Sequence, residues 1–69
     1  MDTVECLASD SYPGTPVAVI WAGARCEVDV ILKRWRDPTG LGYRIRTTDG
    51  LTLDLYYVVH ADAWRVSIP

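Results

Sequence analysis

Apolar and polar side chains alternate on both sides of an Asp49-Gly50 pair, over residues 43–48 and 51–58. Alternation with a period of two puts one set of side chains on one face of a β-strand, and Asp-Gly between two such runs is a strong hairpin signal. No ten-residue window of the chain carries the sustained 3.6-residue apolar repeat of an amphipathic helix. The chain is therefore predicted to be all-β.

The register of this hairpin follows from the faces of its two strands. A two-residue loop would pair Ile45 with Asp54 and turn a carboxylate toward the core. A three-residue loop, with Gly50 in a left-handed bulge, pairs Ile45 with Leu53 instead. It also brings Arg44 opposite Asp54 on the outer face. The apolar pairing favours the three-residue loop.

The rest of the chain contains further short β runs, separated by Gly, Pro and Asp. The other predicted strands are residues 3–8, 16–22, 24–36 and 64–68, with connecting loops at 9–16 and 37–42. In the long strand, one face is predicted to carry Cys26, Val28, Val30 and Leu32. The other face is predicted to carry Glu27, Asp29 and Lys33 together with Ile31 and Trp35, and a bulge near Lys33 is expected to reset the faces.

Sequential strands joined by short loops generally pair with their neighbours. The pattern therefore predicts an antiparallel meander of five to six strands, which buries its apolar face by curling into an SH3-like, partly open barrel. An open sheet that dimerises through its apolar face is the alternative. With 69 residues there is room for one domain, made of an N-terminal strand and loop (1–15) and a barrel core (16–69).

The sequence carries no signal for a metal, a disulfide framework or a membrane span. Its two cysteines, Cys6 and Cys26, lack C-x-x-C spacing and are accompanied by a single histidine. We expect them to be small buried apolar side chains, with a disulfide or reactive thiol as the alternative. No apolar run approaches the roughly 18 residues of a membrane span, and residues 1–5 lack the basic start of a signal peptide. A soluble, cytoplasmic protein is expected.

No group of residues suits a known enzymatic reaction. His60 and Asp62 lack a recognisable nucleophile or second base. Gly40, Gly42 and Gly50 lie in turn contexts, with no following helix whose amides could bind phosphate. We predict a protein without enzymatic activity, cofactor or small-molecule substrate.

Charge is distributed unevenly along the chain. Five of the seven basic residues lie within residues 33–46, where Asp37 is the only acid. Pairing of the long strand with the next one would bring the arginines of the two strands close together, beside Trp35 and Tyr43. The candidate interaction surface is Arg34, Trp35, Arg36, Arg44, Arg46 and the outward-pointing Tyr56.

Two functions are compatible with this surface. Trp, Tyr and Arg are enriched at protein interfaces, so the leading expectation is a non-catalytic interaction module that binds a protein partner or itself, as a homodimer, through a sheet face or edge. The alternative is weak binding of single-stranded nucleic acid, which uses cations and stacking aromatics. The net charge of −2 favours the protein partner, because nucleic-acid domains are usually basic.

The order of packing residues resembles a family of small uncharacterised bacterial β domains. The matching residues are Pro16, Trp21-Ala22-Gly23, Val28, Ile31-Leu32, Trp35-Arg36, Tyr43-Arg44-Ile45, Asp49-Gly50, Leu55, Trp64 and Val66. They form a Trp-x-Gly hairpin, a strand ending in Trp and a strand pair closed by a late Trp, over residues 16–68. Similar domains occur in bacteria beside DNA-repair polymerases. The resemblance thus implies a DNA context without catalysis and assigns no functional residue.

Overall fold

A computed structural model describes residues 4–8 and 13–69, which form six β-strands and one 3-10 turn. The strands are β1 (Val4–Leu7), β2 (Thr15–Trp21), β3 (Ala24–Asp37), β4 (Gly40–Thr47), β5 (Thr52–Val58) and β6 (Ala63–Ser67), and the turn is η1 (Val59–Ala61). Residues 9–12 of the predicted first loop lie outside the described residues. Within the described ranges, no helix has the length and apolarity needed to cross a membrane.

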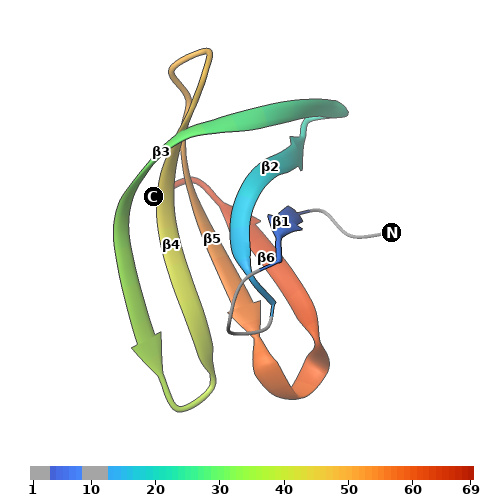
Figure 1. Cartoon of the computed structure of the whole chain (residues 1–69), viewed down its shortest axis with the longest axis vertical. Helices are drawn as coiled ribbons and strands as arrows, with labels where there is room; N and C mark the ends of the chain where they lie inside the picture. Colours follow the sequence, from blue (N-terminus) through green and yellow to red (C-terminus); the bar gives the residue numbers. More distant parts are fainter. Residues whose placement is uncertain (1–3, 9–12) are drawn as a thin grey trace.

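Each strand pairs antiparallel with the next one along the chain, giving the sheet order β1-β2-β3-β4-β5-β6. The sheet curls strongly without closing, and β1 and β6 are the first and last strands of its order in the described part of the chain (Figure 1). This open half-barrel confirms the predicted all-β meander and partly open barrel.

Strand β3 joins the two halves of the half-barrel, because it changes partner along its length. Residues 24–27 pair with β2, whereas the part from Val28 to Asp37 pairs with β4. Figure 1 shows β3 crossing the upper part of the molecule and then bending down beside β4. The bend allows β1 and β2 to face β4 and β5 across the core.

Two bulges determine which side chains of β3 face the core. The register with β4 shifts at Asp29 and again at Leu32. The second shift confirms the bulge predicted near Lys33, but the first was not predicted. Because an extra residue reverses the alternation of faces, Ile31 packs against the core and Val30 is exposed. The prediction that Val30 shares a face with the apolar residues before it is therefore wrong, and Leu32 is exposed as well.

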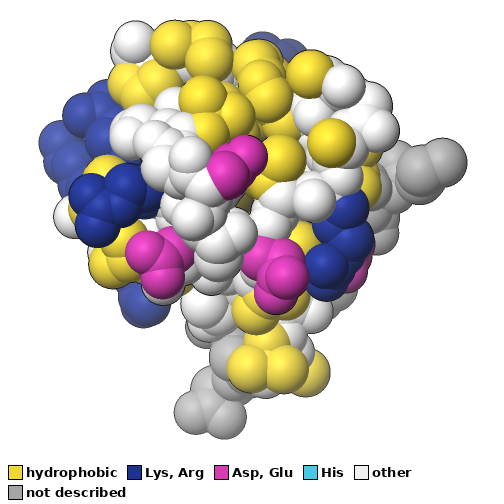
Figure 2. Space-filling model, turned by 90° about the horizontal axis from the view of Figure 1, so that it is seen from above, with side chains coloured by type: hydrophobic (Ala, Val, Ile, Leu, Met, Phe, Trp, Pro, Cys, Tyr) yellow, Lys and Arg dark blue, Asp and Glu magenta, His cyan; other side chains and the backbone are white. Residues whose placement is uncertain are grey.

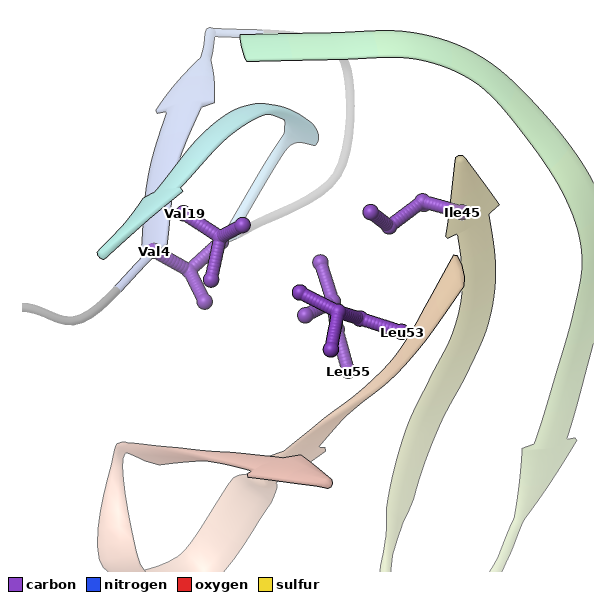
Figure 3. Close-up of a cluster of buried hydrophobic side chains, with 5 residues drawn as sticks. All are labelled: Val4, Val19, Ile45, Leu53 and Leu55. Atoms are coloured by element: carbon purple, nitrogen blue, oxygen red, sulfur yellow. The ribbon is translucent and has the colours of Figure 1, made fainter. Parts of the chain in front are cut away.

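The core fills the hollow of the half-barrel. Its buried cluster consists of Val4, Val19, Ile45, Leu53 and Leu55. Figure 3 shows the side chains of β1 and β2 pointing across the hollow toward those of β4 and β5. Trp21 and Trp64 pack against the margin of this cluster. In so small a barrel, large aromatic side chains form part of the core.

The β4–β5 hairpin has the register that its alternation predicts. Ile45 lies opposite Leu53, and Arg44 lies opposite Asp54. Gly50 closes the loop by donating its N–H to the carbonyl of the residue three positions earlier (3.0 Å), with a left-handed φ of +89°. The predicted three-residue loop with a bulge at Gly50 is confirmed.

The connection from β3 to β4 is shorter than predicted. A loop was expected over residues 37–42, but Asp37 pairs with Gly40, so that only Pro38 and Thr39 lie outside the strands. Asp, Pro and Gly at the first, second and fourth positions match the preferences of a type I turn. Gly40 and Gly42 therefore belong to β4, and the expected loop is wrong for residues 40–42.

The two cysteines do not form a disulfide. Cys6 lies opposite Pro16 of β2 and Cys26 lies opposite Val19, so the two cysteines are separated by two strand spacings across the sheet and by three residues along it. Bridged cysteines need Cα atoms within about 7 Å of each other. Both side chains are half-buried against the core, which agrees with the predicted packing role.

We expect Gly50→Val to lower the free energy of unfolding by about 1–2 kcal/mol, because an L side chain is strained at positive φ. No atom lies within 4 Å of the position that its Cβ would take, so the cost comes from the backbone alone. Gly50→Asn should lose clearly less, because Asn tolerates this region. Urea unfolding of the three proteins measures the difference, and equal losses for Val and Asn would contradict the assignment.

Candidate functional site

The outer face is the face of β3 to β6 that points away from the core cluster. Pairing across the four strands arranges its outward side chains in rows. One row is Trp35, Gly42, Tyr56 and Arg65, and the next is Lys33, Arg44, Asp54 and Ser67. The outer face thus combines two aromatic rings with several cations.

Trp35 lies across the backbone of β4 at Gly42. A Cβ atom at Gly42 would overlap the indole ring, whereas a Cβ at Gly40 would overlap the backbone carbonyl oxygen of Tyr57 and lie 2.8 Å from the ring of Tyr56. Gly42 is needed because the Trp35 ring occupies the space of a side chain, and Gly40 because the backbone of β5 and the Tyr56 ring do so. The ammonium of Lys33 lies 5.8 Å from the centre of the Trp35 ring, within cation–π range.

Tyr56 is held by the turn between β3 and β4. Oδ1 of Asp37 accepts hydrogen bonds from the hydroxyl of Tyr56 (2.6 Å), the hydroxyl of Thr39 (2.8 Å) and the backbone N–H groups of Thr39 and Gly40 (both 2.9 Å). Because Tyr56 belongs to β5, these bonds connect the turn to β5 across β4.

The same hydrogen bonds shift the pKa values of Asp37 and Tyr56. The hydrogen bond from Tyr56, followed by those from Thr39 and Gly40, lowers the pKa of Asp37 to about 2. The bond to Asp37 in turn raises the pKa of the Tyr56 hydroxyl above its ordinary value. At neutral pH, Asp37 is ionised and Tyr56 is protonated, so neither group is poised for acid–base catalysis. The contacts fix the Tyr56 ring without activating its hydroxyl.

Arg44 forms a bidentate ion pair with Asp54. Its Nε and Nη2 atoms donate to the two carboxylate oxygens of Asp54 at 2.8 and 3.1 Å. The pair raises the pKa of Arg44, which stays charged. Arg46, Arg65 and Lys33 form no salt bridge with any other described residue. They are the outer-face cations whose charge no described acid offsets.

The structure divides the six candidate residues between two faces. Trp35, Arg44, Arg46 and Tyr56 share the outer face. Arg34 and Arg36 lie opposite Tyr43 and Leu41 and point to the inner side of β3. Tyr43, which was expected to add to the aromatic surface, instead packs inward, with its ring centre 6.0 Å from that of Trp64.

Comparisons with protein-family models, curated proteins and solved structures found no match to this chain. The resemblance to small bacterial β domains therefore stays a prediction. The site has to be interpreted from its own geometry.

Two outer-face residues were missing from the candidate list. Lys33 belongs to the same basic cluster, and the alternation that predicts it on one face with Trp35 could have added it to the list. Arg65 alternates with the inward-facing Trp64 and Val66, so its outward direction could have been inferred. Its position beside Tyr56 needed the pairing of β5 with β6.

Basic side chains gather on the side of the molecule where β3 descends. Figure 2 shows Lys and Arg side chains grouped at the left, the side of β3 in Figure 1, with a further basic group at the right and acidic side chains between them. In the described part of the chain, no group of three or more His, Cys, Asp or Glu side chains could hold a metal ion. His60 lies in the exposed turn η1.

The Asp37 contacts predict a pH dependence. The pKa of Asp37 is about 2 in the folded chain, below its ordinary 3.8, so its carboxylate stabilises the fold above about pH 4 and loses this effect as the pH falls toward 2. Tyr56→Phe removes the largest cause, which raises this pKa and weakens the pH dependence of unfolding between pH 4 and 2. Carbon-13 NMR titration of the Asp37 carboxyl tests this, and an identical midpoint in both proteins would refute it.

We expect Gly42→Ala to displace the Trp35 ring and to lower stability, because the new Cβ overlaps the indole. The indole N–H resonance of Trp35 should shift, while those of Trp21 and Trp64 stay in place. Gly23→Ala is the control: its φ of +80° makes this substitution destabilising as well, but no atom lies within 4 Å of its Cβ position, so the Trp35 resonance should not shift. An unchanged Trp35 resonance in Gly42→Ala would show that the ring does not lie over β4.

Proposed function

We propose that this chain is a non-catalytic interaction module that binds a protein partner through the outer face around Trp35. The supporting observation is that both aromatic rings are fixed in advance: Trp35 lies over Gly42, and Tyr56 is bonded to Asp37. Trp, Tyr and Arg dominate binding hot spots. Rings that are already ordered lose little conformational entropy on contact, which favours binding.

The ionic groups around the rings agree with a protein partner. Arg44 is paired with Asp54, whereas the outer-face cations Lys33, Arg46 and Arg65 form no salt bridge with another described residue. A surface of half-buried aromatic rings with separate cations is typical of protein interfaces. The protonated Tyr56 and ionised Asp37 are consistent with a role without catalysis. As part of the same proposal, the protein acts in the cytoplasm.

Single-stranded nucleic acid is the second candidate. Lys33 beside Trp35 places a cation next to a ring on which a base could stack. The DNA context implied by the family resemblance points the same way. The net charge of −2 and the carboxylate of Asp54 among the cations weigh against a continuous phosphate track.

The test is quantitative affinity capture from cells that express the chain, comparing the native sequence with Trp35→Ser. Leu7→Ser is the matched control, because Leu7 is an exposed apolar residue of β1, outside the outer face. Circular dichroism and thermal unfolding establish that all three proteins are folded. We expect a partner protein to be retained by the native chain and by Leu7→Ser, and to be lost with Trp35→Ser.

Recovery of the same proteins with all three chains would overturn the proposal. Concentration-dependent sedimentation that Trp35→Ser abolishes would identify the partner as a second copy. Binding of labelled oligothymidylate at low salt, weakened by Arg46→Ala, would favour the nucleic-acid alternative, because its phosphate contribution is strongest there.

A further inference from the structure

One edge of β3 has no strand beside it in the described part of the chain. From Val28 onward β3 pairs only with β4, and Figure 1 shows no ribbon along its other side. The register is irregular at the two bulges but regular over residues 33–37. We call the side of these five residues that faces away from β4 the β3 edge. An unpaired edge presents backbone N–H and C=O groups to any extended segment that lies alongside it.

The β3 edge is flanked by cations on both faces of the sheet. Lys33 and Trp35 point to the outer face, whereas Arg34 and Arg36 point to the inner side. All three cations are exposed, and none forms a salt bridge with another described residue. Asp37, at the end of the edge, is engaged by Tyr56 and the turn. An added strand would therefore meet positive charge on both of its faces.

This charge pattern favours one kind of binding partner at the β3 edge over the others. Two copies of the β3 edge placed side by side would oppose Lys and Arg to Lys and Arg, which is unfavourable. A nucleic acid would meet the cations but could not form the backbone ladder of a β-strand. An extended acidic peptide satisfies both the charges and the backbone groups.

We infer that the β3 edge binds an acidic, extended segment of a partner protein as an added β-strand. This inference rests on the proposed function, for which it names the chemistry of the partner and its mode of binding. Successive side chains of the added strand point to opposite faces. Its carboxylates then lie beside Lys33 on the outer face and beside Arg34 and Arg36 on the inner side.

The same geometry gives a pattern for the bound segment. The position beside Trp35 faces an indole ring and takes an apolar side chain, whereas the neighbouring positions take acids. Along the edge the partner carries Glu-Glu-Leu-Glu or the reverse order, Glu-Leu-Glu-Glu, according to strand direction.

The experiment titrates the folded chain with fluorescein-labelled peptides of about ten residues centred on these two sequences, at low and moderate salt. Control peptides replace Glu by Gln, or carry N-methyl groups on alternate backbone amides, which keeps the acids but removes ladder N–H groups. Arg34→Glu with Arg36→Glu removes the inner cations. Leu7→Glu with Val17→Glu adds negative charge at exposed positions of β1 and β2, away from both the β3 edge and the outer face.

We expect one acidic peptide to bind and to slow amide hydrogen exchange within residues 33–37. Arg34→Glu with Arg36→Glu should weaken binding by about tenfold or more, and the control pair much less. No binding at low salt, equal binding of the N-methylated peptide, or binding of oligothymidylate alone would overturn the inference. A captured partner that needs Trp35 but tolerates Arg34→Glu with Arg36→Glu would refute the added strand and leave the proposed function standing.

Discussion

The structure depends on strand β3 pairing with β2 over its first residues and with β4 over the rest of its length. β3 leaves β2 after Glu27 and pairs with β4 from Val28, and the extra residue at Asp29 lies where this change occurs. Because bulges bend a strand and increase its twist, the two halves of the sheet can face each other. Val4 and Val19 then meet the buried side chains of β4 and β5 across the hollow. A straight β3 would leave this small core open to water.

The hairpin of β4 and β5 could be predicted because its information is local. Alternation fixes which side chains share a face, and the pairing of Ile45 with Leu53 then leaves one choice of loop. The faces of β3 could not be predicted in the same way. A bulge at Asp29 leaves no mark in the alternation, since Val30 and Ile31 are equally apolar.

The candidate site was predictable in composition but not in arrangement. Gly40 and Gly42 were interpreted as loop residues, since glycine commonly marks turns. Their place in β4 depends on the Trp35 ring from β3 and on the Tyr57 carbonyl and Tyr56 ring from β5. Cross-strand contacts of this kind exist only once the register is known. Arg34, by contrast, could have been separated from Trp35 by alternation alone, since adjacent residues of a strand point to opposite faces.

The carboxylate of Asp37 has a mechanical consequence. It binds the turn that ends β3 and, through Tyr56, also holds β5, so three adjacent strands are fastened at one point. Strand ends normally fray one by one, because each loses few contacts on opening. Here the ends of β3, β4 and β5 must separate together. Polar side chains therefore give this end of the half-barrel a cooperativity that the apolar core provides elsewhere.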